Sequence, residues 1–461
     1  MITALHCARK SICPGRYLSL LIPPLLVLLC VSSTAHAQNH FPCYSEIQKN
    51  VTFWKDVYDK YDSTQGILHD RTDPTIIYTV VNLINWEFPK AGKINRQITR
   101  LARKRIKKIL LDLGHGKKPA TEEEKKIASL FPRNKPAAFL QARENIRLQV
   151  GQKDRFYRGV IRSGKYIGQL KKIFRAYGLP EELAYLPHVE SSFYPLANSK
   201  ADARGLWQFT AGTGKQYLTI NELVDERLDP HLSSHAAAKL LKENYSQLKT
   251  WPLALTAYNY GRAGMIRAVK EHKTYQKVFL LYNKGYFKFA SRNFYSEFLA
   301  ALEIAKKLEN DPKLKKHKPE ATLTVRLPGY ASCARMRTFF KVGKQDFARL
   351  NPALRPSVLN DTLLMPKGYL MRLPATKKIR TRLSQLNQSL FSGSQVAHTY
   401  HIVRKGESVS AIAQQHHTSA RTINRLNNLP KNSTIRIGQK LKIPYNKEKV
   451  LLLKTKGKRT P

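Results

Sequence analysis

Acidic residues are scarce in this chain. Its 461 residues include 32 Asp and Glu against 80 Lys and Arg, which gives a formal net charge of +48. A chain this unbalanced needs an anionic partner or surface. Nucleic acid is the usual candidate for so basic a protein, and cell-wall carboxylates and anionic lipid headgroups are the others. Charge alone does not choose among them.

Cysteine is also scarce, and the histidines lack ligand spacing. Of 5 cysteines, only Cys43 and Cys333 lie beyond residue 37. One disulfide between them is conceivable in an oxidising compartment, but two cysteines without a motif give no metal or redox site. The 14 histidines are scattered, and none forms a His-Glu-x-x-His pattern. The sequence therefore predicts no metal and no cofactor.

The N-terminus has the pattern of a secretory signal. Arg9, Lys10 and Arg16 precede an apolar stretch over 18–31, and Ala35-His36-Ala37 follows it. We therefore predict a signal peptide over 1–37, cleaved after Ala37. The alternative is an uncleaved membrane anchor, although the stretch is short for a bilayer span. Cleavage would remove three cations and leave a net charge of +45.

Export changes the choice of partner. An exported protein meets few nucleic acids, so the sequence argues against a nucleic-acid-binding protein even though the charge fits one. In the periplasm or cell envelope the anionic partners are wall peptides and lipid headgroups. We therefore expect contact with the wall, and we keep an anionic membrane surface as a second candidate.

The length predicts two to four domains. Residues 38–170 read as a basic, helical region. Within it, 98–113 has apolar residues at helical spacing against an Arg/Lys face. Such a helix either packs on a neighbour with a solvated cationic side or binds a membrane or nucleic acid. The remaining predicted parts are a catalytic region (171–308), two small modules (322–374 and 398–445) and a basic tail (446–461).

One stretch, 183–214, organises the catalytic region. Its apolar run carries a single acid, Glu190, which Phe193 and Trp207 follow closely. A carboxyl group among such side chains is poorly solvated, so its pKa should rise toward the value that a general acid needs near neutral pH. The alternative is that Glu190 only caps or flanks a helix and has no catalytic role. The next acids do not share this apolar setting: Asp202, Glu222, Asp225, Glu226 and Asp229. We therefore expect one catalytic carboxyl group, and we read Asp225 to Pro230 as a turn with an internal Asp–Arg pair.

Three segments in order carry a resemblance. They are Glu190-Ser191, Gly205-Leu206-Trp207-Gln208 and Ala257-Tyr258-Asn259. Together they resemble the E-S, G-L-[MW]-Q and A-Y-N motifs of the lytic murein transglycosylases. The resemblance implies a mainly α, lysozyme-like domain that cleaves the bond between N-acetylmuramic acid and N-acetylglucosamine without water. In such enzymes one Glu acts as acid and then as base, and the product carries a 1,6-anhydro ring.

The resemblance also implies roles for individual residues. Glu190 is the catalytic acid and base, and Tyr258 matches the tyrosine that hydrogen-bonds it. Gln208 and Ser199 fall where family members contact the sugar, and Asn259 orders its loop or contacts the N-acetyl group. The remaining assignments to substrate binding are Trp207 and Ser191. Trp207, Phe209 and Tyr260 are either stacking faces for sugars or core residues.

Two positions depart from the family. Thr210 stands where soluble relatives often have a Met that contacts a sugar ring. Phe294 occupies the slot of a tyrosine near the start of the closing helix, with Tyr295 beside it.

The second C-terminal module resembles a LysM domain. Its motifs are His401 to Ser408, then Arg425-Leu426-Asn427, then Ile437 to Pro444. The resemblance implies a βααβ fold that binds glycans containing N-acetylglucosamine. The first module keeps parts of this pattern but lacks the G-E-S and I-G-Q signatures, so it is either a second glycan site or a spacer.

The predicted fold class is therefore α+β and multidomain. The predicted function is a peptidoglycan lytic transglycosylase with its glycan strands as partner. A hydrolytic muramidase and a non-catalytic wall-binding protein are the alternatives.

Overall fold

A three-stranded antiparallel sheet lies in the N-terminal region, where the sequence predicted only helices. In the computed structural model, which describes residues 40–132, 135–395, 398–430 and 433–444, the strand order is β2-β1-β3. The region consists of η1 (Ser45–Ile47), α1 (Gln48–Asp59), β1 (Gln65–Asp70), β2 (Ile77–Asn82), α2 (Ala91–Gly114), α3 (Glu122–Ser129), α4 (Pro136–Arg143), β3 (Ile146–Val150) and α5 (Lys153–Ser163). The strands are only five or six residues long, and β1 pairs with β3, which lies about 80 residues later in the chain. The predicted signal peptide and basic tail lie outside the described residues.

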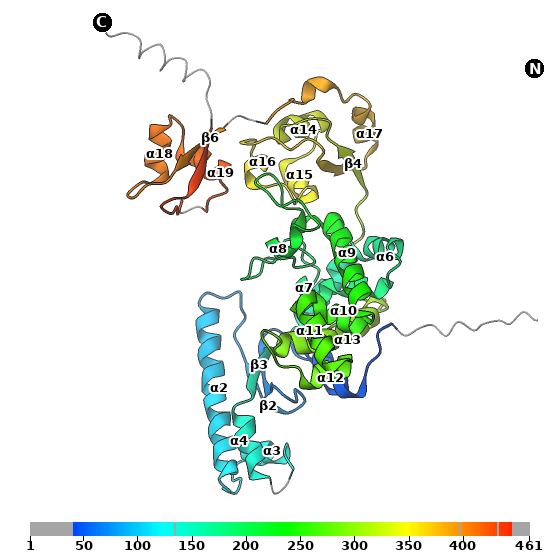
Figure 1. Ribbon diagram of the computed structural model, residues 1–461, viewed down its shortest axis with the longest axis vertical. Coiled ribbons are helices and arrows are strands. Elements are labelled where there is room, and N and C mark those ends of the chain that lie inside the picture. The colour runs from blue at the N-terminus through cyan, green and yellow to red at the C-terminus, as the bar shows by residue number, and fades with distance from the viewer. Residues whose placement is uncertain (1–39, 133–134, 396–397, 431–432, 445–461) are drawn as a thin grey trace, which may run out of the picture. The chain divides into compact units, whose positions relative to one another are not determined.

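The predicted basic helix is confirmed as part of α2 (Figure 1). Its apolar stripe, including Ile106 and Leu110, packs with Tyr78 and Ile127 in a small core of its own. The helix is therefore a packing element with a cationic outer side, which was the first of the two alternatives. Leu101, assigned to the same stripe, is 56% exposed.

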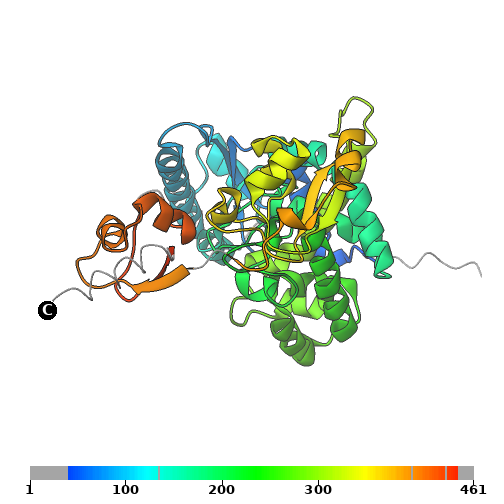
Figure 2. The same ribbon diagram turned by 90° about the horizontal axis from the view of Figure 1, so that it is seen from above.

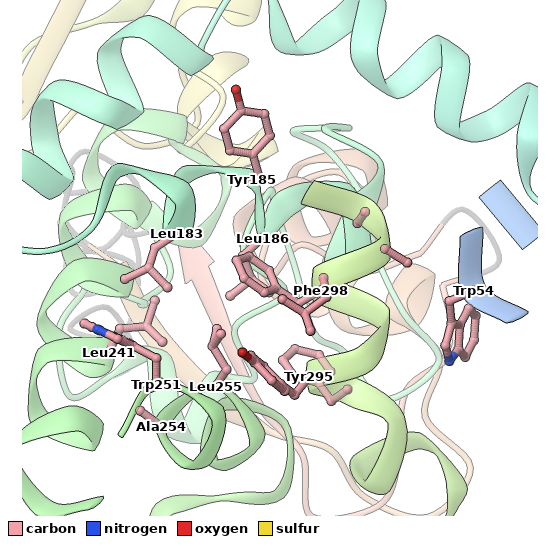
Figure 3. Close-up of a cluster of buried hydrophobic side chains, with 14 of the residues drawn as sticks. Trp54, Leu183, Tyr185, Leu186, Leu241, Trp251, Ala254, Leu255, Tyr295 and Phe298 are labelled. Carbon is pink, nitrogen blue, oxygen red and sulfur yellow. The ribbon is translucent and has the colours of Figure 1, made fainter. Parts of the chain in front are cut away.

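The catalytic region is a bundle of helices around one large core. It contains α6 (Ile167–Ala176), η2 (Glu181–Tyr185), α7 (Pro187–Ser191), α8 (Ala211–Gly214), η3 (Glu226–Leu228), α9 (Pro230–Leu248), α10 (Trp251–Tyr260), α11 (Arg262–His272), α12 (Tyr275–Leu281) and α13 (Phe289–Glu309). Figure 3 shows part of this core, with Leu186, Leu255 and Phe298 close together. Helix α1 packs along α13, so the N-terminal region and the catalytic bundle share the core.

Two small modules follow, each built on a two-stranded antiparallel sheet. The first contains β4 (Thr322–Arg326), α14 (Cys333–Phe340), α15 (Lys344–Leu350), α16 (Pro356–Leu359), β5 (Leu370–Pro374), α17 (Lys377–Leu383) and η4 (Gln388–Leu390). Its core extends past the predicted end at residue 374: Ile379 is buried in it, and partly buried residues as far as Phe391 pack against it. The core also includes Val224 and Leu426, from outside the module. The second contains β6 (His398–Ile402), α18 (Val409–Gln415), α19 (Ala420–Leu426) and β7 (Lys440–Pro444). Figure 2 shows this module in orange to red, and the order of its elements confirms the predicted βααβ fold.

The conceivable disulfide is not formed. Cys43 is exposed, Cys333 is buried, and both are free. No helix in the described part of the chain is long and apolar enough to cross a bilayer.

Candidate active site

Glu190 lies on a helix of only five residues. From the sequence we expect one helix that begins at Pro180 and carries Glu190 near its C-terminal end. The chain instead forms the 3-10 turn η2 and then α7, with Pro187 in its first turn. Helix α7 ends at Ser191, and the next two residues, Ser192 and Phe193, both have positive φ (47° and 54°). The reversal turns the Phe193 ring into the core, where it is 0% exposed, and so fixes the direction of the residues beside Glu190.

A neighbouring helix holds this reversal. The guanidinium of Arg162, on α5, donates a hydrogen bond of 2.6 Å to the Ser192 carbonyl. Gly159, one turn earlier on α5, lies so close that a Cβ there would be 3.0 Å from the same carbonyl oxygen. Helix α5 thus supports the end of α7 with a close backbone approach and a charged donor.

The Glu190 carboxyl group is half-buried, and no side chain or backbone group in the described residues hydrogen-bonds to it. Burial, and after it the negative charge of Glu297, raises the pKa of Glu190 to about 8. The predicted rise in pKa is therefore confirmed. At neutral pH most of the carboxyl groups keep their proton, and that proton is free for a ligand.

The second motif forms a tight loop against α7. Gly205 has a φ of 79°, and a Cβ at this position would be only 1.9 Å from the Arg227 carbonyl oxygen, so only glycine fits. The Ser191 hydroxyl donates to the Leu206 carbonyl at 2.9 Å. Ser191 thus ties the loop to the helix that carries Glu190, and its hydroxyl is occupied within the protein.

The side chain of Gln208 is held by the backbone of the loop that carries it. Gln208 has a φ of 47°, and its amide nitrogen donates to the Gly205 carbonyl at 2.9 Å. The amide oxygen has no protein donor in the described residues, which leaves it as an acceptor for a ligand.

Tyr258, near the end of α10, joins the third motif to the other two. Its hydroxyl donates to the Trp207 carbonyl at 2.7 Å. Burial, followed by the negative charge of Glu190, raises the pKa of Tyr258 well above its ordinary value, which places the two side chains near each other. The Tyr258 hydroxyl donates its proton to the Trp207 carbonyl. Its oxygen can therefore serve only as a hydrogen-bond acceptor toward a protonated Glu190.

Trp207 is a core residue. Its side chain is 0% exposed, its Nε1 donates to the Ser234 hydroxyl at 2.8 Å, and its ring lies 5.5 Å from that of Phe174. This corrects the assignment of Trp207 to sugar binding. Phe209, at 2% exposed, is likewise a core residue, whereas Tyr260 is half-buried.

Ser199 and Asn259 both have protein partners. The Ser199 hydroxyl accepts hydrogen bonds from the backbone N–H groups of Ala201 and Ala203, at 3.2 and 3.0 Å. The Asn259 side-chain oxygen accepts from Ser291 at 2.7 Å. Each still has a donor to offer, the hydroxyl proton of Ser199 and the amide group of Asn259. Phe294 lies parallel to Tyr258, with ring centroids 6.4 Å apart, and Tyr295 is a core residue whose hydroxyl donates to the Pro42 carbonyl.

A buried ion pair supports the loop from behind. The Asp225 carboxylate, 0% exposed, accepts from Arg227 at 2.8 and 2.9 Å, and Arg227 donates in turn to the Phe209 carbonyl. The predicted Asp–Arg pair is thus confirmed. Burial alone would raise the pKa of Asp225, but the hydrogen bond and charge of Arg227, with Arg355 and Arg204, hold it below its usual value. Asp225 is a charged structural group.

The sequence analysis missed a second carboxyl group near Glu190. Glu297 lies on α13, half-buried, and accepts a hydrogen bond of 2.8 Å from the buried Tyr58 hydroxyl. A signal existed, because Glu297 is three residues after Phe294 and four before Ala301, both in the buried stripe of α13.

Two family models match the chain. Residues 170–279 match the transglycosylase SLT domain, and residues 401–444 match the LysM domain. The chain thus carries an SLT domain followed by a LysM domain, in the order that the motifs predicted.

Known relatives match part of the chain. Membrane-bound lytic murein transglycosylase D of Escherichia coli, from strain K12 and from an O6:H1 strain, is 26% identical over 300 residues. The match covers 60% of this chain, and the chain spans 62% of the length of those relatives. An inactive mutant of lytic transglycosylase Slt from Pseudomonas aeruginosa aligns at 14% identity, over 50% of this chain and 36% of the other, with a TM-score of 0.27.

Proposed function

We propose that this chain is a lytic transglycosylase that cleaves the bond between N-acetylmuramic acid and N-acetylglucosamine in peptidoglycan and closes a 1,6-anhydro ring. The observation that carries the proposal is the unpartnered Glu190 carboxyl group with a pKa of about 8, beside the loop of Gln208 and the hydroxyl of Tyr258. The match to the transglycosylase SLT domain supports the same reading.

In the proposed reaction Glu190 acts twice. It first gives its proton to the oxygen that bridges the two sugars, and the bond from that oxygen to the anomeric carbon breaks. The N-acetyl group of the muramic acid stabilises the cation that remains. The Glu190 carboxylate then takes the proton of the C6 hydroxyl while that oxygen bonds to the anomeric carbon. The proton count balances, and no water enters the product.

The other assignments follow from the free groups around Glu190. Tyr258 orients the protonated carboxyl group as an acceptor. The amide oxygen of Gln208 and the free donors of Ser199 and Asn259 face the sugar, while Ser191 positions Glu190 through the Leu206 carbonyl.

The surrounding parts have their own proposed roles. Residues 1–37 direct export to the periplasm or cell envelope and are removed, and the LysM domain binds glycan containing N-acetylglucosamine. The basic N-terminal region (38–170) and tail (446–461) contact anionic wall groups or a membrane surface. Residues 171–308 form the catalytic domain, and 322–374 form the LysM-like module.

Digestion of purified wall sacculi tests the proposal. The wild-type chain should release muropeptides lighter by one water than those of a hydrolytic muramidase. Glu190→Gln should lower the rate by about 10²–10⁴-fold while glycan binding is kept. The matched control is Glu182→Gln, which removes a partly exposed carboxylate of η2 that pairs with Lys306 at 3.3 Å and should leave the rate unchanged. Hydrated products would establish the muramidase, and full activity of Glu190→Gln would overturn the assignment.

A further inference from the structure

Two carboxyl groups and a tyrosine form a cluster behind the site. Glu297 accepts the 2.8 Å hydrogen bond from Tyr58, which is 2% exposed. Burial raises the pKa of Tyr58 well above its ordinary value, and the charges of Glu297 and Glu190 raise it further. The packing brings Glu190 to the same place. The Tyr58 ring lies 4.5 Å from that of Phe156, which lies 5.0 Å from the ring of His188, two residues before Glu190, and α7, which carries Glu190, packs against α13, which carries Glu297.

The position of this cluster is fixed by packing. Tyr58 is on α1 and Glu297 is on α13, and these two helices lie against each other. Their register is pinned by a second buried hydrogen bond, 2.7 Å from the Asn50 amide to the Asn293 side-chain oxygen. Asn293 is one turn before Glu297 and Asn50 two turns before Tyr58, so the same helix pairing makes both bonds. The contact is part of the core and not a surface encounter.

The two carboxyl groups compete for ionisation. Burial raises the pKa of Glu297 to about 7, although the Tyr58 hydrogen bond and the charge of Arg147 lower it. Like charges close together in a poorly solvated site disfavour each other. Tyr58 stabilises the charge on Glu297, so that charge opposes the loss of a proton from Glu190.

We propose that Glu297, oriented by Tyr58, is a positioning residue that keeps the proton on Glu190 until the glycosidic oxygen takes it. The inference rests on the proposed function of Glu190. Glu297 itself neither gives nor takes a proton in the reaction. After the first step its negative charge makes the Glu190 carboxylate a stronger base for the C6 hydroxyl proton. One neighbour thus assists both halves of the cycle.

The other titratable groups around Glu190 do not duplicate this effect. Tyr258 on α10 and Tyr58 on α1 are neutral in this range, because the pKa of each is raised well above its ordinary value, first by burial. His188, on α7 itself, stays neutral because burial lowers its pKa to about 3, with the charge of Arg162 on α5 adding to the effect. Arg147, on β3, acts on Glu297. Among the described residues, Glu297 is the neighbour whose negative charge adds to burial in raising the pKa of Glu190.

The test is the pH dependence of kcat/KM on sacculi for Glu297→Gln, which keeps the shape of the side chain. The alkaline limb should move to lower pH by about one unit, since Glu190 then loses its proton more readily. Tyr58→Phe should move the limb in the same direction by less, because Glu297 loses the donor that stabilises its charge. The matched control is Glu303→Gln, an exposed carboxylate on the same helix, which should leave the limb in place.

A titration of the Glu190 carboxyl carbon by NMR gives a readout that needs no catalysis. The signal is assigned by its loss in Glu190→Gln, and its midpoint should fall in Glu297→Gln. A folded Glu297→Gln chain with an unchanged midpoint and limb would overturn the proposal. If that variant does not fold, the Tyr58→Phe midpoint decides. Failure of the proposed function would look different, because hydrated products can occur with either midpoint.

Discussion

A carboxyl group that keeps its proton at neutral pH makes the folded state sensitive to alkali. The Glu190 pKa is about 8 in the fold, against an ordinary value near 4.5 for a solvated Glu. Between these values the folded chain holds a proton that the unfolded chain has lost. The contribution of this proton to the free energy of unfolding is therefore fully present below about pH 4.5 and is lost as the pH rises through 8.

Glu190→Gln should consequently be more stable than the wild type at pH 8 and about equal to it at pH 4. We expect an advantage of about 1–4 kcal/mol at pH 8, discounted because the side chain is only half-buried. Urea unfolding at the two pH values measures it. Glu303→Gln, whose carboxylate is exposed, is the control and should show no such pH-dependent gain. An equal effect of Glu190→Gln at both pH values would contradict the raised pKa.

Residue-scale prediction succeeded where the signal is local. The order of three short motifs was enough to bring Glu190, Gln208 and Tyr258 to one place. Trp207 could not be assigned in this way, because its exposure depends on Phe174 and Ser234, which lie far from it in the chain. Glu297 was missed for the same reason, since its partner Tyr58 is 239 positions away.

At the scale of the element, the loop at 205–209 depends on one glycine. Gly205→Ala would combine a positive φ with a Cβ placed 1.9 Å from the Arg227 carbonyl oxygen. The backbone must move, at a cost on the order of 3 kcal/mol, and Gln208 moves with it. We expect a lower unfolding midpoint and a fall in kcat on sacculi.

Gly212→Ala is the matched control for this loop. Gly212 lies in α8, and a Cβ there would meet nothing within 4 Å. This change should be neutral or stabilising by ~0.4–1 kcal/mol, with activity unchanged. If both variants behaved alike, the close approach at Gly205 would not be what shapes the loop.

Helices and strands were easier to predict when they were long or when clear motif residues marked where they begin and end. The long periodic stretch of α2 and the βααβ order of the LysM domain were both found. The helix of Glu190 was predicted as one piece, yet it breaks before Pro187, which lacks the N–H that would continue the hydrogen bonding. The sheet of β1, β2 and β3 was missed because its pairing joins residues far apart, such as Gly66 with Val150.

At the scale of the whole molecule, the proposed active site and the LysM domain have separate hydrophobic cores. The LysM domain has its own hydrophobic cluster, which includes Val403, Ile412 and Leu441. Glu190 and its neighbours belong to another core, built from the N-terminal region and the catalytic bundle. A change confined to the LysM core should therefore leave the chemistry of Glu190 intact.

Deletion of residues 398–461 separates the two contributions. A tethered module raises the local concentration of its ligand, so its loss should weaken retention on sacculi by roughly 10–100-fold. Turnover of short soluble glycan strands should stay close to that of the full chain, because that substrate needs only the catalytic bundle. Co-sedimentation and product release on the two substrates measure these effects.

Deletion of 446–461 alone removes basic tail residues but keeps the LysM core, so it distinguishes binding at a glycan site from attraction by general charge. If the short deletion weakened binding as much as the long one, wall attachment would be electrostatic and the LysM domain would not be its source.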